Sequence, residues 1–175
     1  MTRLHIHVER ATAHWKNAFK KMDDKIECAA ALAVARAKKP AAFRRRDLEI
    51  NIILTGDRQI KTLNRDYRGL DKPTNVLSFP QFDVRKFDRS MLAHFPAANP
   101  VPLGDVVLAW QTVRRESREQ KKDLENHTLH LIVHGTLHLL GYDHMKPGEA
   151  KAMEKLECDI LKTLGYPDPY HEIHA

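Results

Sequence analysis

Apolar and polar residues alternate along several short segments of this chain. The pattern begins within 4–8 and repeats over a longer stretch in 48–55. Alternation of this kind places one set of side chains on the buried face of a strand. Shorter strands are predicted over 76–80, which Pro80 closes, and over 104–109. These segments are expected to pair in one sheet.

Helical periodicity of the apolar residues separates these strands. Helices are predicted over 26–39, over the short stretch that follows Asp57, and over 112–122, 126–140 and 147–164. Asp23 or Asp24 is expected to cap the first of them, and Asp57 the second. The helix over 126–140 is apolar on nearly all sides, so it should be central and buried. The pattern predicts an α+β fold, a small mixed sheet packed with helices, in a single domain over 1–175.

The segment 82–102 follows no sustained period. Pro96, Pro100 and Pro102 interrupt it, and its charges are mixed. Long segments without regular structure are uncommon inside a domain and are often functional. We therefore expect a surface loop or flap here.

Three histidines lie close together near the end of the predicted central helix. His134 and His138 are four residues apart, so both project from one helix face. Gly141 favours the left-handed conformation that ends a helix, and a turn there brings His144 towards the same point. Three protein ligands with a fourth position left for water are typical of catalytic zinc. The spacing predicts a catalytic metal centre that holds one Zn²⁺ per chain.

The same spacing is also the frame of a class of zinc peptidases, HExxHxxGxxH. In those enzymes a glutamate directly follows the first histidine. Gly135 stands at that position here and has no side chain to act as a general base. A peptidase is therefore the less favoured interpretation.

The surroundings of the cluster leave alternatives open. His127 and His130 either line the same cleft or contact solvent or a nearby carboxylate. Asp143, next to Tyr142, either orients an imidazole or only holds the turn. No residue stands out as a general base, so the nucleophile is left open between a metal-activated water and a hydroxyl group of the substrate itself.

The charge of the chain indicates a polyanionic partner. The formal net charge is +6 and the pI is near 9.4. Clustered Lys and Arg side chains neutralise phosphates and release counterions. The cations concentrate in 36–46 and in 114–122, although each cluster alone fits a solvated surface equally well.

Other features of the composition concern the cellular compartment. No apolar run approaches the roughly 20 residues that span a bilayer, and the start of the chain lacks the apolar core of a signal peptide. Cys28 and Cys158 are too few for a disulfide framework. We expect a cytoplasmic protein with no membrane partner.

Two blocks of this sequence resemble a known family. The run His134–His144, HGTLHLLGYDH, is similar to the HGxLHLxGYDH signature of the endoribonuclease YbeY family, also described as the 16S rRNA maturation factor family. The block Leu63–Pro80, LNRDYRGLDKPTNVLSFP, resembles a second family motif, LNxxYRxxDxPTNVLSFP. A third, shorter match is the strand that starts with Leu103–Asp105. The resemblance extends from about Leu48 to Gly165.

The resemblance implies a single-domain, zinc-dependent hydrolase that cuts single-stranded RNA. It implies roles in 16S rRNA 3′-end processing, ribosome maturation and ribosome quality control, with the 16S rRNA precursor and the small ribosomal subunit as partners. The family's metal ligands carry over to His134, His138 and His144, and its functionally important arginine to Arg68. A competing interpretation is a ribosome-associated assembly or binding factor in which the metal mainly fastens the buried helix to the turn. Without the resemblance, Arg68 would be interpreted as a helix-end arginine that binds nearby carbonyls.

Overall fold

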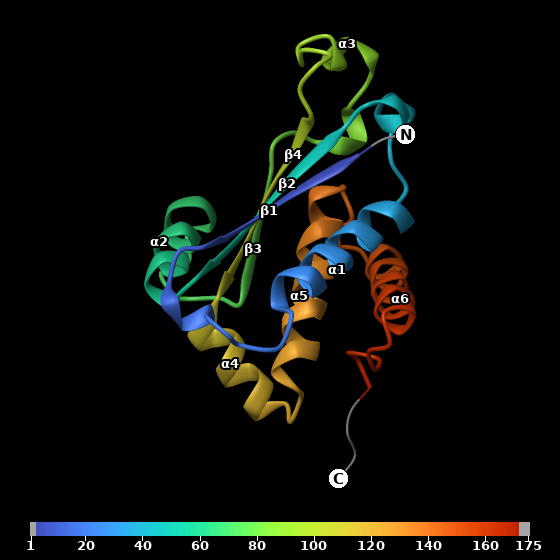
Figure 1. The fold of residues 1–175 in the computed structure, drawn as a ribbon. Helices are drawn as coiled ribbons and strands as arrows, with labels where there is room; N and C mark the ends of the chain where they lie inside the picture. Colours follow the sequence, from blue (N-terminus) through green and yellow to red (C-terminus); the bar gives the residue numbers. More distant parts are fainter. Residues whose placement is uncertain (1–2, 172–175) are drawn as a thin grey trace.

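A four-stranded mixed sheet forms the centre of the fold (Figure 1). The computed structural model describes residues 3–171, so positions 1–2 and 172–175 of the predicted domain lie outside the described residues. The strands are β1 (Leu4–Arg10), β2 (Leu48–Thr55), β3 (Val76–Pro80) and β4 (Val101–Ala109). Their order is β1-β2-β4-β3, in which β1, β2 and β4 are parallel and β3 is an antiparallel edge strand. The predicted mixed sheet and α+β class are confirmed.

Helices cover the sheet on both faces. The helices of the fold are α1 (Met22–Arg36), α2 (Asp57–Arg68), α3 (Arg89–Leu92), α4 (Trp110–Glu119), α5 (Leu124–Leu139) and α6 (Pro147–Thr163). Three short 3-10 turns accompany them: η1 (Ala13–Trp15), η2 (Ala41–Arg45) and η3 (Val84–Lys86). Helices α1, α5 and α6 lie on one side of the sheet, whereas α2 packs on the other side (Figure 1).

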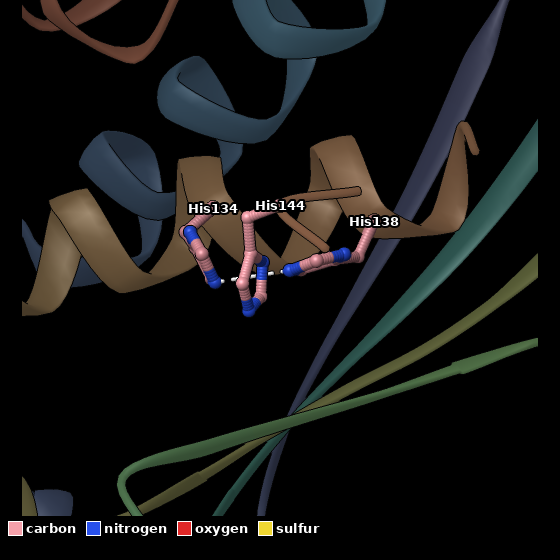
Figure 2. Close-up of side chains that lie close together, drawn as sticks. All are labelled: His134, His138 and His144. Atoms are coloured by element: carbon pink, nitrogen blue, oxygen red, sulfur yellow. Dashed lines mark hydrogen bonds between the residues drawn. The ribbon is translucent and has the colours of Figure 1, made fainter. Parts of the chain in front are cut away.

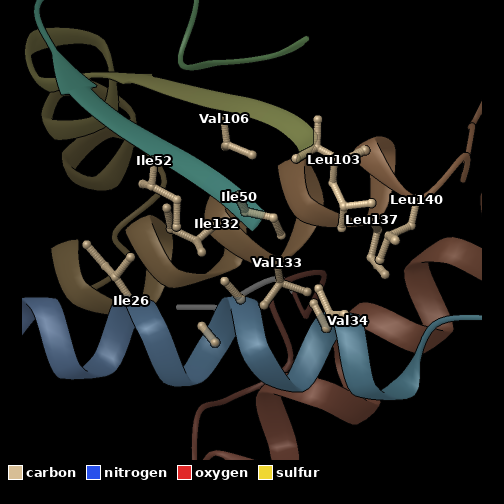
Figure 3. Packing of buried hydrophobic residues seen from close by; sticks show 14 of the residues in the cluster. Ile26, Val34, Ile50, Ile52, Leu103, Val106, Ile132, Val133, Leu137 and Leu140 are labelled. Carbon is tan, nitrogen blue, oxygen red and sulfur yellow. The ribbon is translucent and has the colours of Figure 1, made fainter. Parts of the chain in front are cut away.

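Helix α5 is the centre of the larger core. Ile132, Val133 and Leu137 are buried between α1 and the sheet residues Ile50 and Val106 (Figure 3). No residue of α5 is exposed among those the structure describes. The predicted central, buried helix is confirmed, and it begins two residues earlier than expected because Asp123 caps it.

Two predicted helix caps are wrong. Lys21, in a left-handed conformation, precedes α1, so Asp23 and Asp24 lie inside its first turn. Gly56 is the N-cap of α2, and the Asp57 carboxylate instead accepts hydrogen bonds from the backbone and hydroxyl of Thr112 at 3.0 and 2.8 Å. The side chain of Asp57 therefore joins α2 to the start of α4.

Strand β4 begins three residues before the predicted position. Proline is rare within strands because it has no N–H to donate, which made the segment near Pro102 a poor candidate. The ladder with β2 shifts its register between Glu49 and Ile50, whose partners are Pro102 and Gly104. Leu103 is the extra residue, and its carbonyl accepts a hydrogen bond from the Gln81 backbone. The bulge thus lets the strand continue past the proline.

The segment 82–102 is more ordered than a plain loop. It contains η3 and α3, and its last residues belong to β4. Val84 and Phe87 are buried, and Phe87 packs on Phe43 with ring centroids 4.7 Å apart. The tip with α3 extends beyond the end of the sheet (Figure 1).

Among the described residues, none of the helices is both long enough and apolar enough to cross a membrane.

Candidate metal centre

The structure brings the three predicted histidines together. His134 and His138 project from the same face of α5, and His144 reaches them from the turn that follows (Figure 2). The ring centroids of His138 lie 4.6 Å from His134 and 5.0 Å from His144. One nitrogen of each ring falls within 4.8 Å of the others, a spacing that allows the three rings to hold one ion.

The turn after α5 has the geometry that the glycine predicted. Gly141 has φ of +85°, the left-handed region that favours glycine. Its N–H donates to the His138 carbonyl at 3.0 Å, and the Tyr142 N–H donates to the Leu137 carbonyl at 3.1 Å. These two bonds form a Schellman motif, which reverses the chain and carries His144 back to α5.

The tautomers of the two helical histidines follow from their partners. Nδ1 of His138 lies 2.9 Å from the Tyr142 carbonyl, and Nδ1 of His134 lies 2.8 Å from Oε1 of Glu157. A carbonyl oxygen can only accept a hydrogen bond, and the same is true of an ionised carboxylate. Each Nδ1 must therefore carry the proton. In these tautomers neither Nε2 atom carries a proton, so the 3.1 Å contact between them, drawn as a dashed line in Figure 2, brings two lone pairs together.

This arrangement fits a metal ion. Two lone pairs at 3.1 Å repel each other unless a cation lies between or beside them. Burial lowers the pKa of His138, and the charges of the neighbouring His134 and His144 rings lower it further, to about 4. The ring therefore stays neutral at pH 7. Metals bind the neutral imidazole. His134, His138 and His144 are therefore able to hold a zinc ion with neutral nitrogen ligands.

Glu157 is a buried carboxylate behind the histidines. It lies on α6, is 0% exposed, and accepts hydrogen bonds from His134, from His130 at 2.8 Å and from the Tyr170 hydroxyl. Burial alone would raise its pKa, but these three bonds outweigh burial and lower the pKa to about 2. Glu157 is thus ionised and fixes the orientation of His134, as carboxylates behind metal-bound histidines commonly do.

The sequence interpretation missed Glu157. The apolar periodicity of this segment predicts α6, and its residues Met153, Ile160 and Leu161 are buried. Glu157 occupies the same stripe, four residues after Met153 and three before Ile160. A carboxylate inside an apolar stripe was the available signal, since buried acids are almost always paired.

Two of the alternatives left open around the cluster are now assigned. His127 contacts Glu116 at 2.9 Å and His130 contacts Glu157, so each lies against a carboxylate and neither lines the cleft that holds Arg68 and the three histidines. Asp143 accepts a hydrogen bond from the His144 backbone at 2.7 Å. Its carboxylate therefore holds the turn.

A cleft of about 750 Å³ opens over the histidines. Its wall includes Arg68, Ser78, Arg85, His134, His138 and His144. Arg68 is the last residue of α2 and donates one hydrogen bond to the Ser78 carbonyl at 3.3 Å. The arginine thus binds a nearby carbonyl and also faces the same cleft as the candidate ligands.

Arg85, which lies in η3, is a second arginine that lines this cleft. The sequence patterns did not predict a role for it. Its side chain pairs with Asp83 at 3.2 Å and lies against Gly141. Arg85 thus brings the segment 82–102 to the edge of the site.

Gly135 is enclosed by the sheet. A Cβ atom there would lie 2.5 Å from Val106 Cγ1 and 3.1 Å from Ser78 Oγ. The Ser78 hydroxyl also donates to the Gly135 carbonyl at 3.0 Å. A glutamate at this position would have to displace β3 and β4, so the general base of the zinc peptidases has no room in this fold.

The sequence comparisons with known proteins identify one family, and a solved structure shares the fold. The family described as "Endoribonuclease YbeY" matches residues 11–165. A protein named "Endoribonuclease YbeY" from Rhodopseudomonas palustris (strain BisB18) is 49% identical over 124 residues, which cover 71% of this chain and 70% of the relative. Another of that name, from strain BisA53, is 46% identical over 145 residues, covering 83% and 76%. The solution structure of TM1509 from Thermotoga maritima is similar in fold, with a TM-score of 0.50 at 22% identity, over 95% of this chain and 99% of that one.

Proposed function

Because this chain belongs to the YbeY endoribonuclease family, we propose that it is a zinc-dependent endoribonuclease that cuts single-stranded RNA. The observation that carries the proposal is the cleft in which Arg68 faces the three histidines. A cation-binding cluster beside an arginine suits a phosphodiester, which is anionic before and during cleavage.

His134, His138 and His144 are proposed as the ligands of one zinc ion per chain. All three are neutral donors, so the positive charge of the ion is not reduced by its ligands. Zinc bound here would supply Lewis-acid polarisation of a phosphoryl oxygen and a more acidic water. Glu157 and the Tyr142 carbonyl keep the two helical rings in the tautomer that turns Nε2 towards the cleft.

Arg68 is proposed to bind the scissile phosphate. A guanidinium has five N–H donors in a planar fork. Among the described residues its only hydrogen-bond partner is the Ser78 carbonyl, which fixes the side chain at the cleft wall and leaves further donors for a ligand. Arg68 would thus orient the phosphate and stabilise the charge that develops on its oxygens.

The proposed cellular role is maturation of ribosomal RNA in the cytoplasm. The substrate would be the 3′ end of the 16S rRNA precursor, within or near the small ribosomal subunit, and defective ribosomes would be further targets. The family membership and the basic character of the chain support this role.

The competing function is an assembly factor with a structural metal. In that case the ion would be needed to hold the turn against α5. The turn is already closed by two backbone hydrogen bonds and by the Lys38 N–H, which donates to the Tyr142 hydroxyl at 3.0 Å. Because protein groups alone make these contacts, they favour a chemical role for the metal.

A cleavage assay on matched RNAs tests the proposal. Purified zinc-loaded protein should cut a single-stranded 16S 3′-end precursor and leave the same sequence intact when a complementary strand covers it. An assembly factor would bind both RNAs or the small subunit without cutting either. Absence of cleavage in zinc-loaded, folded protein would refute the proposed activity.

A further inference from the structure

A second hollow lies beside the cleft, at the tip of the segment 82–102. It has a volume of about 810 Å³ and is formed between η2 and the region of α3. Its lining includes Arg44, Arg45, Arg46, Arg89, Leu92 and Phe95. No acidic side chain belongs to that lining among the described residues. We call it the arginine hollow.

Arg46 builds the arginine hollow. Its guanidinium donates to the carbonyls of Phe95, Pro96 and Asn99, with the bonds to Pro96 and Asn99 at 2.7 and 3.0 Å. These bonds attach the tip of the segment 82–102 to the chain that leads into β2. The hollow is therefore a fixed feature of the fold.

Arg45 and Arg89 line the arginine hollow from its two sides. Both side chains are exposed, one on η2 and the other on α3. Neither makes a hydrogen bond or ion pair with any residue that the structure describes. Other cations of the same region do have partners: Lys39 donates to the Ala37 carbonyl at 3.2 Å, and Arg36 to Thr163 at 3.4 Å. Arg45 and Arg89 are thus two guanidinium forks available for an anionic ligand.

The arginine hollow and the metal cleft are neighbours, because an aromatic residue of one lining packs on an aromatic residue of the other. Phe82 lines the cleft, Phe95 lines the hollow, and their ring centroids are 5.9 Å apart. Arg85 of the cleft and Arg89 of the hollow are only four residues apart in the chain. The segment 82–102 thus contributes residues to both the cleft and the hollow, which places the two sites next to each other.

We propose that the arginine hollow binds the backbone of single-stranded RNA on one side of the cut, an inference that rests on the proposed nuclease function. Arginine forks match the geometry of phosphate oxygens. Phe95 and Leu92 supply an apolar floor against which unpaired bases can pack, the combination found in single-strand binding grooves. The hollow then increases affinity for long RNA, while the chemistry stays at the metal centre.

The test is a double substitution, Arg45→Ala with Arg89→Ala, in the full-length protein. Lys151→Ala with Lys155→Ala is the matched control, because it removes the same charge from an exposed face of α6, away from the tip with α3 (Figure 1). The probes are oligouridylates of about 4 and about 20 nucleotides, lengths that bracket typical single-strand site sizes. Binding of the longer probe is measured by fluorescence anisotropy with a chelator present, over a range of salt concentrations. Cleavage of both probes is measured with zinc.

The arginine variant should bind the longer RNA more weakly. Loss of two phosphate contacts should make the slope of log K against log salt shallower by about 1.4 for a single strand. Cleavage of the short RNA and the behaviour of the lysine control should match the original protein.

Three outcomes overturn the proposal: unchanged binding of the longer RNA, an equal loss in the lysine control, or an equal loss of cleavage for both lengths. The assay also separates the two proposals. If the original protein cuts neither RNA, yet its binding of the longer RNA still depends on Arg45 and Arg89, the nuclease function fails and the hollow stands.

Discussion

Oε1 of Glu157 lies 2.8 Å from Nδ1 of His134 and connects α6 to the metal centre. The carboxylate also accepts hydrogen bonds from His130 and from the Tyr170 hydroxyl. A negative charge with these partners holds His134 in one tautomer and makes its Nε2 a better donor to a metal. Glu157 is accordingly expected to control metal affinity without touching the ion.

Glu157→Gln should weaken zinc binding by about 10- to 100-fold, the usual cost of losing such a partner. An amide has nearly the same shape as the carboxylate but accepts through only one oxygen and carries no charge. The zinc dissociation constant can be measured by competition with a coloured chelator.

Glu154→Gln provides the control for that experiment. Glu154 is exposed on the same helix, and its replacement removes the same charge one turn away. Equal zinc affinities for the Glu157 variant and this control would show that Glu157 has no role in the site.

Arg68→Ala should lower the rate of RNA cleavage by about 10²- to 10³-fold, the range seen when one donor to a developing anion is removed. Zinc content and unfolding behaviour should not change, because the Ser78 carbonyl is the only hydrogen-bond partner of the Arg68 side chain among the residues that the structure describes. Arg65→Ala, on the same helix but outside the cleft, should leave cleavage unchanged. Similar rates for the two variants would refute the proposed role of Arg68.

Gly135→Ala should lower the free energy of unfolding by about 1–3 kcal/mol, the typical cost of overpacking a core. The added methyl group would meet Val106 at 2.5 Å and push α5 away from the sheet. Gly148→Ala is the control, since its Cβ would have no neighbour within 4 Å. Urea unfolding measures both, and a similar stability for the two variants would mean that α5 does not pack so closely at Gly135.

Local patterns in the sequence were sufficient for much of the fold and for the core of the candidate site. The turn at Gly141 and the common face of His134 and His138 depend only on helix geometry, so spacing predicted both. The edges of elements were less predictable. The bulge at Leu103 depends on pairing with β2, a strand about fifty residues earlier, and no local signal reports it.

Contacts between distant segments account for what the sequence interpretation missed. Glu157 meets His134 only after α6 has packed beside α5. The arginine hollow exists because Arg46 binds carbonyls near Phe95, and nothing in the spacing of these residues predicts that contact. In both cases the charged residue was visible in the sequence, but only the tertiary structure shows which group it contacts.

Zinc content and RNA cleavage, measured on one purified sample before and after chelation, test the central claim most directly. Tri-histidine coordination predicts close to one zinc per chain, loss of single-strand cleavage when the metal is removed, and recovery when zinc is returned. His138→Ala should lose both zinc and cleavage, whereas His94→Ala, exposed beyond α3, should lose neither. Cleavage that persists at full rate in metal-free protein, or in the His138 variant, would contradict the account.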